Sequence, residues 1–219
     1  TLPLHDARPI SIGSSNYVVS STEANLNKGT FGQIVENFYH QVLGLIEGGA
    51  DVLLIETQQD ILETKAIIEG ANKAFAEKKI KLPMIVQATV DVFSKMQIFN
   101  TDIHAAYTAV SKMGIDVFGI NCNVGPDEMV ATVEKLSRVC RHPISVVPNA
   151  GQPISEDGQT CYKLSPEDMA NTMEPFVREH GVSIVGGCCG TTPAHIKALR
   201  EKLKGGVPAT RQPDKNIYV

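Results

Sequence analysis

The sequence predicts an α/β protein of the (β/α)8 TIM-barrel type, with about six strand–helix units present in this chain. Short apolar runs alternate with longer amphipathic stretches along the whole chain, at intervals typical of βα units. The apolar runs are almost continuous, as expected for parallel strands that are buried on both faces. Polar residues and cysteines follow these runs, and a barrel brings the carboxyl ends of all its strands to one mouth.

An open, doubly wound sheet is the competing architecture. Its dinucleotide-binding form carries a G-x-G-x-x-G segment after the first strand, and no such segment follows the first apolar run here. An open sheet would also spread the polar strand ends along an edge instead of gathering them. The barrel is therefore the favoured fold, although six strands are fewer than a closed barrel needs.

Strands and helices are expected in strict alternation. Thr30 is expected to be the N-cap of the first helix, and Gly48 ends that helix. Pro126 opens a later helix, and Ser165 followed by Pro166 combines an N-cap with a proline at the first helical position. The expected strands cover residues 9–13, 51–55, 82–89, 117–122, 144–149 and 182–187. The expected helices cover residues 31–48, 62–75, 101–113, 126–140, 165–180 and 194–204.

The chain is expected to divide into a partial barrel, residues 1–204, and a tail or linker, residues 205–219. The tail carries Pro208 and Pro213 and shows no periodic apolar pattern. Such a segment is expected to be a linker between this domain and further domains.

Composition excludes several classes of protein. The chain of 219 residues has 42% hydrophobic and 20% charged residues, which is ordinary for a soluble globular protein. A net charge of −4 with scattered Lys and Arg gives no basic patch, so no nucleic-acid partner is expected. No apolar run is long enough to span a membrane, and the first residues do not resemble a signal peptide. The odd number of five cysteines, without regular spacing, favours a reducing compartment, here the cytoplasm.

Cysteines at strand ends predict a metal site. Cys188 and Cys189 are adjacent in a glycine-rich segment that follows the last strand, and Cys122 ends the strand two before it. Three thiolates with one open position describe a catalytic zinc site, and sulfur ligands favour zinc over magnesium or calcium. Asn149 ends the intervening strand, so its amide oxygen is a candidate for the open position.

Other interpretations of these residues remain open at this stage. Cys140 and Cys161 lie in a helix end and a loop, where a cysteine is usually a small buried apolar residue. The pair Cys188 and Cys189 could instead be a redox couple or a vicinal disulfide. Glu56 ends an apolar strand, where a carboxylate has either a functional role or an ion-pair partner at the barrel rim.

Several segments together resemble the zinc-dependent homocysteine S-methyltransferases. Gly119-Ile120-Asn121-Cys122, with the following Gly-Pro-Asp-Glu-Met, resembles the first cysteine motif of that family. The segments 148–153 (PNAGQP) and 186–193 (GGCCGTTP) match the next two motifs, and 50–57 (ADVLLIET) matches another strand. The resemblance covers about residues 10–203 in order. It is closest to the homocysteine-binding domain of cobalamin-dependent methionine synthase.

The resemblance implies a zinc ion on Cys122, Cys188 and Cys189, with Asn149 as a fourth ligand before the substrate arrives. Glu56 would hold the amino group of homocysteine. Asn16 and Thr89 lie at other strand ends of the same mouth and are candidate substrate contacts.

The implied reaction is methyl transfer to the homocysteine sulfur from methylcobalamin carried on another domain or protein. A homocysteine methyltransferase with a small donor, such as betaine or S-methylmethionine, is the first alternative, and a non-catalytic zinc-binding barrel fragment is the second. The family's barrel begins with two further βα units that find no match here. Another chain is one source from which those strands could come.

Overall fold

The structure is a computed structural model that describes residues 9–12 and 30–214 of the chain, with side chains from residue 30 onward. Its main sheet contains β1 (Pro9–Ile12), β2 (Val52–Gln58), β3 (Met84–Ala88), β6 (Val117–Asn121), β7 (Ile144–Val147) and β10 (Ile184–Val185). The helices are α1 (Phe31–Glu47), α2 (Ile61–Lys78), α3 (Ile103–Val110), α4 (Pro126–Val139), α5 (Pro166–Arg178) and α6 (Pro193–Leu203). Among the described residues, no helix has the length and apolarity that crossing a membrane requires.

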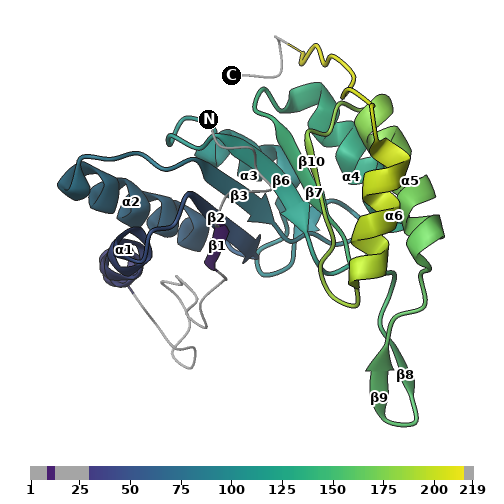
Figure 1. Ribbon diagram of the computed structural model, residues 1–219. Coiled ribbons are helices and arrows are strands. Elements are labelled where there is room, and N and C mark those ends of the chain that lie inside the picture. The colour runs from purple at the N-terminus through teal and green to yellow at the C-terminus, as the bar shows by residue number, and fades with distance from the viewer. Residues whose placement is uncertain (1–8, 13–29, 215–219) are drawn as a thin grey trace.

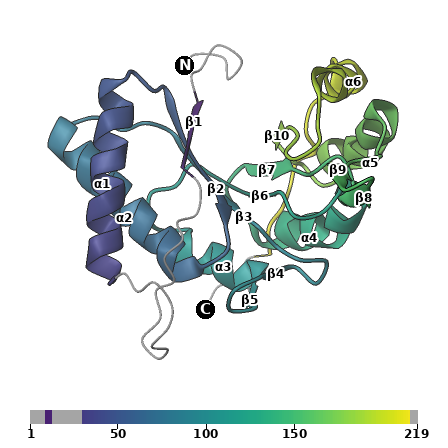
Figure 2. The same ribbon diagram turned by 90° about the horizontal axis from the view of Figure 1, so that it is seen from below.

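The main sheet is parallel, and its six strands follow one another in chain order as β1-β2-β3-β6-β7-β10. A doubly wound sheet would instead reverse its strand order at a switch point. Consecutive helices pack against each other from α1 to α6, and they form one layer outside the curved sheet (Figures 1 and 2). In Figure 2 the strands form an open arc whose two edges are β1 and β10. This is a partial TIM-barrel-type fold, as the sequence predicts.

The helix boundaries follow local signals in the sequence. Thr30 caps α1 and forms a capping box with Gln33, while Ser165 caps α5 ahead of Pro166. The last strand is shorter than expected because it reaches Val185 and then enters two glycines. Gly186 nevertheless still donates a hydrogen bond to Val146 of β7.

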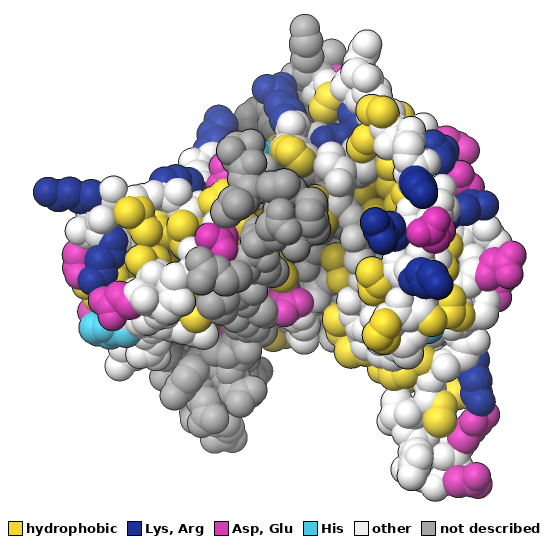
Figure 3. Space-filling view, viewed as in Figure 1, with side chains coloured by type: hydrophobic (Ala, Val, Ile, Leu, Met, Phe, Trp, Pro, Cys, Tyr) yellow, Lys and Arg dark blue, Asp and Glu magenta, His cyan; other side chains and the backbone are white. Residues whose placement is uncertain are grey.

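Two short hairpins interrupt stretches that were expected to be loops. The hairpin β4–β5 (Lys95–Met96 and Thr101–Asp102) lies between β3 and α3, and the second strand takes the first two residues of the expected helix. The hairpin β8–β9 (Ile154–Glu156 and Gln159–Cys161) lies between β7 and α5. In Figure 3 it projects from the lower right of the molecule. Lys163, just after β9, forms an exposed ion pair of 2.6 Å with Glu156 at the end of β8.

The two faces of the sheet differ in character. One row of registered neighbours contains Ile55, Val86, Phe118 and Ile144, all of them buried. Phe118 packs against Tyr107 of α3, with ring centroids 5.2 Å apart, so this row faces the helices. Side chains alternate along a strand, so the next row, with Gln87, Gly119 and Ser145, faces the concave side.

On the concave side, Gln87 reaches across Gly119. Its Nε2 donates to Ser145 Oγ over 2.7 Å, which links β3 to β7 past the intervening strand. A Cβ on residue 119 would lie 2.0 Å from the carbonyl oxygen of Ser145. Glycine is therefore required at this position by the close approach of the neighbouring strand.

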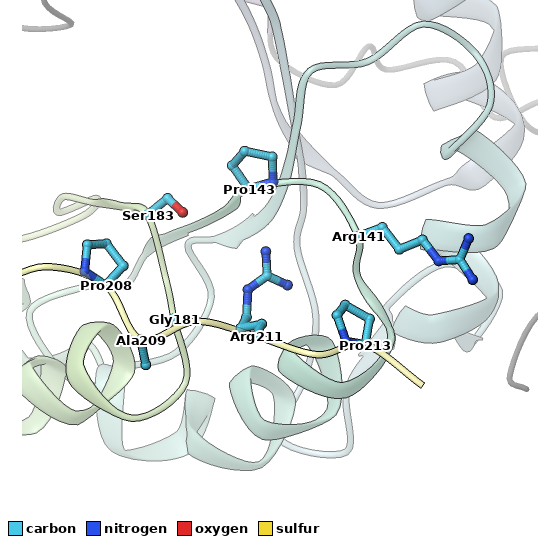
Figure 4. Close-up of a pocket in the computed structure, with 8 residues that line it drawn as sticks. All are labelled: Arg141, Pro143, Gly181, Ser183, Pro208, Ala209, Arg211 and Pro213. Carbon is cyan, nitrogen blue, oxygen red and sulfur yellow. The ribbon is translucent and has the colours of Figure 1, made fainter. Parts of the chain in front are cut away.

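The stretch after Gly205, expected to be a tail or linker, packs back on the barrel as far as residue 214. Ala209 N–H donates to Val177 of α5, and the Arg211 guanidinium donates to the carbonyl oxygens of Cys140 and His142. Figure 4 shows Arg211 extending from this stretch into a cavity of about 240 Å³ at the amino-terminal ends of β7 and β10. Residues 206–214 thus pack at the end of the barrel opposite to the mouth. A linker role for the residues that follow stays a prediction.

Replacement of Gly119 by Ala should destabilise the fold by about 1–3 kcal/mol or more, because the new methyl group would force β6 away from Ser145. Gly44→Ala is the matched control, since Gly44 lies in α1 with no atom within 4 Å of a new Cβ. The control should be neutral or stabilising by up to about 1 kcal/mol. Urea denaturation followed by circular dichroism measures both, and equal effects would contradict the packing described for the concave side.

Candidate metal centre

The candidate site lies where β6, β7 and β10 end. Cys122 directly follows β6, Asn149 lies just after β7, and Cys188 and Cys189 follow β10. Since the three strands are parallel neighbours, their carboxyl ends lie at one edge of the sheet. The sequence motifs therefore meet at the mouth of the partial barrel.

The end of β7 lies between the segments that carry Cys122 and the pair Cys188 and Cys189, and it forms hydrogen bonds with both. Cys122 N–H donates to the carbonyl oxygen of Val147 over 3.0 Å, and Cys188 N–H donates to that of Pro148 over 2.7 Å. Cys189 N–H donates to the side-chain oxygen of Asn149 over 3.0 Å. The first two bonds continue the parallel ladder beyond the regular strands, and the side chain of Asn149 fixes the backbone of the third cysteine.

The three sulfur atoms form a compact cluster. The Sγ of Cys189 lies 3.7 Å from that of Cys122 and 4.0 Å from that of Cys188, and all three lie within 4.8 Å of one another. Three sulfurs bound to one zinc ion at about 2.3 Å in tetrahedral geometry would be about 3.8 Å apart. The cluster therefore has the spacing and the soft donor atoms that zinc requires. The Sγ atoms of Cys188 and Cys189 are 4.0 Å apart, almost twice the S–S distance of about 2.05 Å in a disulfide, so the two residues are free thiols here.

The thiols share negative charge unequally. Hydrogen bonds, from Cys188 above all and then from Asn123, Cys189 and Asn149, together lower the pKa of Cys122 to about 5 against the opposing effect of burial. The hydrogen bond between Cys188 and Cys122, together with burial, raises the pKa of Cys188. Cys122 is therefore the first of this coupled pair to become a thiolate, and Cys188 keeps its proton until a cation compensates the charge.

A second polar cluster surrounds the end of β2. The register of β2 shifts between Ile55 and Gln58, and Thr57 lies in the left-handed region with a φ of 58°. The side chain of Asn121 contacts this irregular turn: its Oδ1 accepts from Thr57 N–H over 2.8 Å, and its Nδ2 donates to Thr57 Oγ1 over 2.8 Å. The Nδ2 of Asn121 also lies 3.4 Å from a carboxylate oxygen of Glu56.

Thr89, which directly follows β3, stabilises this cluster through hydrogen bonds to the ends of β2 and β6. It is buried, and its hydroxyl donates to the carbonyl oxygen of Asn121 over 3.0 Å. Its backbone N–H donates to Gln58. The ends of β2, β3 and β6 are thus joined by hydrogen bonds around Asn121, whose side chain is completely buried.

Tyr162 borders the thiols on the side of the β8–β9 hairpin. Its ring lies over Gly190, where φ is +76° and a Cβ would lie 2.2 Å from the Tyr162 Cγ. Burial raises the pKa of the Tyr162 hydroxyl, and the neighbouring Cys189 raises it further. The hairpin thus brings an aromatic side chain against the glycine-rich segment that carries two of the thiols.

The structure brings together most of the residues that the sequence singled out. Cys122, Cys188, Cys189 and Asn149 form one cluster, and Glu56 and Thr89 belong to the polar cluster around Asn121. Asn16 lies outside the described residues.

The other two cysteines stay outside the thiol cluster. Cys140 is completely buried, burial raises its pKa to about 11, and its thiol faces the carbonyl oxygen of His142. Cys161 ends β9. Cys140 fits the expected small buried side chain, whereas Cys161 is only half-buried.

Sequence reasoning overlooked Asn121, Thr57 and Tyr162. Asn121 stood inside a quoted motif, directly before Cys122, and a buried amide at a strand end was a signal for a hydrogen-bonded role. Tyr162 gave a weaker signal, as a single aromatic residue in a loop rich in glycine and polar residues.

Comparison with known proteins agrees with this geometry. The model of the homocysteine S-methyltransferase family matches residues 9–203. The methionine synthases of Mycobacterium tuberculosis (strain ATCC 25618 / H37Rv) and Mycobacterium leprae (strain TN) are 36% and 39% identical over 206 and 188 residues. These matches cover 92% and 84% of this chain but only 17% and 16% of the relatives, so the chain spans about one sixth of their length.

Solved structures match the fold. The apo form of the Escherichia coli homocysteine methyltransferase MmuM superposes with a TM-score of 0.63 at 21% identity, covering 90% of this chain and 62% of that chain. The metallated form of the same protein gives a TM-score of 0.58 at 24% identity, covering 77% and 52%. The sequence motifs, the partial barrel and the family match agree, and this chain belongs to the homocysteine S-methyltransferase family.

Proposed function

We propose that this chain binds homocysteine at a zinc ion held by Cys122, Cys188 and Cys189, and prepares its sulfur to accept a methyl group, with methionine as the product. The observation that carries the proposal is the cluster of three thiols within 4.8 Å of one another at the mouth of the partial barrel. Family membership supports homocysteine as the methyl acceptor.

The chemistry that zinc supplies when bound is to lower the pKa of the homocysteine thiol, normally about 8.5 for such a group, so that the sulfur is a thiolate at neutral pH. The chain provides three thiolate ligands, which together outweigh the double positive charge of the metal. This excess negative charge keeps a bound sulfur electron-rich and nucleophilic. Hydrogen bonds hold the backbone N–H groups of all three cysteines, so little backbone reorganisation is needed when the substrate enters.

Asn149 is the proposed fourth ligand in the absence of substrate. Its side chain is 3% exposed, and its oxygen accepts one hydrogen bond from Cys189 N–H. An amide oxygen has two lone pairs, so a second one is available for the open position. A homocysteine sulfur would displace the weaker oxygen ligand.

Glu56 is the proposed partner of the substrate amino group. A carboxylate attracts an ammonium group and accepts its hydrogen bonds, which fixes the amino acid while the sulfur lies at the thiol cluster. Thr89 supports the same region through Asn121, and Asn16 remains a proposed contact on the strength of the sequence motifs alone. This division of roles places recognition at the end of β2 and activation at the ends of β6 and β10.

The transfer step is a displacement at carbon. A lone pair of the homocysteine sulfur forms the S–CH3 bond, and the electron pair of the bond between methyl and donor leaves with the donor. The sulfur carries no proton at that stage, so the step needs no general base. The product sulfur is a neutral thioether, a weaker metal ligand than a thiolate, which favours release of methionine.

Methylcobalamin on another domain or protein is the proposed donor, and a small donor is the alternative. The motifs favour the methionine synthase branch, and the two relatives named methionine synthase are about six times as long as the matched segment, which leaves room for a donor module in such chains. The open arc between β1 and β10 is where further barrel strands, including strands of another chain, would fit. We place the protein in the cytoplasm because its thiols must stay reduced.

Replacement of Cys188 by Ala should abolish stoichiometric zinc binding, because it removes one of three sulfur ligands and leaves two. We expect zinc affinity to fall at least about 100-fold. Cys161→Ala is the matched control, since that half-buried cysteine lies outside the cluster. Metal analysis after gel filtration measures the zinc content, and full zinc retention in the Cys188 variant would refute the metal site.

Replacement of Glu56 by Gln should weaken homocysteine binding by about 10- to 100-fold, the usual range for loss of a charge-assisted hydrogen bond. Zinc content should stay unchanged, because the carboxylate is not a member of the thiol cluster. Calorimetric titration of the zinc-loaded protein with homocysteine gives the affinity. An unchanged affinity would remove Glu56 from the substrate site.

A further inference from the structure

We infer that Asn121 is a positioning residue that orients the Glu56 carboxylate and so determines how well the site distinguishes homocysteine from a thiol without an amino group. The inference rests on the proposed function, because it assigns a residue to the recognition half of that site. It concerns a side chain that forms hydrogen bonds with Thr57, Thr89 and Glu56, and that, as we propose, does not contact the substrate.

The contacts of Asn121 use its whole amide group. The oxygen accepts from Thr57 N–H over 2.8 Å, and the nitrogen donates to Thr57 Oγ1 over 2.8 Å and to Glu56 Oε2 over 3.4 Å. The side chain is fully buried, so water does not compete for these bonds. Because both the oxygen and the nitrogen of this buried amide form hydrogen bonds, the amide is held in one orientation. Thr57 and Glu56, which bond to it, are thereby restrained as well.

The position of Glu56 depends on an irregular backbone that needs such support. The ladder between β2 and β3 breaks after Ile55, and Thr57 adopts a φ of 58°, which is unfavourable for a β-branched residue. The side chain of Asn121 satisfies Thr57 N–H at this break. Without Asn121 the turn loses this support, and the carboxylate of Glu56 loses one of the groups that orient it.

Asn121 also joins the two halves of the proposed site through the chain itself. It is the last residue of β6, and the next residue is Cys122, whose φ of 62° is likewise in the left-handed region. One residue therefore connects the end of β2, where the amino group would bind, to the end of β6, where the sulfur would bind. A fixed distance between the Glu56 carboxylate and the thiol cluster favours a ligand whose amino group and sulfur are separated by that same distance.

The test compares homocysteine with 4-sulfanylbutanoate, which has the same chain and thiol but no amino group. Affinities are measured by calorimetry for the zinc-loaded parent protein, Asn121→Ala, Glu56→Gln and the double variant. We expect Asn121→Ala to weaken homocysteine binding about tenfold or more, the effect of losing a charge-assisted hydrogen bond. Binding of 4-sulfanylbutanoate and zinc content should change less than about twofold.

The double variant shows whether Asn121 acts through Glu56. If it does, Asn121→Ala should cost less than about twofold in homocysteine affinity once Glu56 is already Gln, because the interaction it supports is gone. Equal weakening of both ligands, or additive effects of the two replacements, would overturn the inference and leave the proposed function standing. A parent protein that binds neither thiol would overturn both.

A second variant covers the case in which Asn121→Ala does not fold. Thr57→Ala removes the hydroxyl that accepts from Asn121, together with the γ-methyl group, and keeps the N–H that donates to Asn121. It should lower homocysteine affinity in the same ligand-selective way, by a smaller factor, while Thr57→Ser, which keeps the hydroxyl, should bind both thiols like the parent. Identical behaviour of the Ala and Ser variants would count against the inference.

Discussion

The parallel pairing of β7 between β6 and β10 is the constraint on which the candidate site depends. The last residue of β7 and the two residues after it accept hydrogen bonds from the N–H groups of Cys122, Cys188 and Cys189. The thiols therefore converge because three strands end together, before any metal draws them together. Strand order makes this possible. In a sheet whose strands follow chain order, Cys122 and Cys188 are 66 positions apart in the sequence but follow strands with only β7 between them.

The mouth of the barrel also holds unfavourable backbone conformations. Thr57, Cys122 and Asn123 all have positive φ values, each costing about 1–2 kcal/mol for a residue with a side chain. They occur at the ends of β2 and β6, and hydrogen bonds from Asn121, Thr89 and Asn123 side chains surround them. The rest of the fold, with its fully buried row facing the helices, supplies the stability that such turns require. Strain is thus concentrated where side chains must point in directions that a regular strand would not allow.

Much of this could be predicted from the sequence because it follows from periodicity and order. Continuous apolar runs marked the parallel strands, caps such as Thr30 and Ser165 marked helix starts, and cysteines at strand ends predicted a common site once the strands were taken to be parallel. The hairpins β4–β5 and β8–β9 could not be predicted, since strands of two or three residues are too short to show an alternating pattern.

The features that escaped prediction depend on three-dimensional neighbours. The role of Asn121 follows from a register shift in β2 and from its reach across the end of β3, and neither is written in the local sequence. The packing of residues 206–214 likewise depends on carbonyl oxygens of the segment before β7, which Arg211 reaches from 69 and 71 positions away. A proline-containing stretch without periodicity carries no signal for such long-range contacts.

X-ray absorption at the zinc edge tests the central claim most directly, because it counts the sulfur atoms bound to the metal. We expect three sulfur ligands at about 2.3 Å and one nitrogen or oxygen ligand in the zinc-loaded protein. Addition of homocysteine should replace the lighter ligand and give four sulfurs. A zinc site with fewer than three sulfurs, or a sulfur count that stays the same when homocysteine binds, would contradict the account.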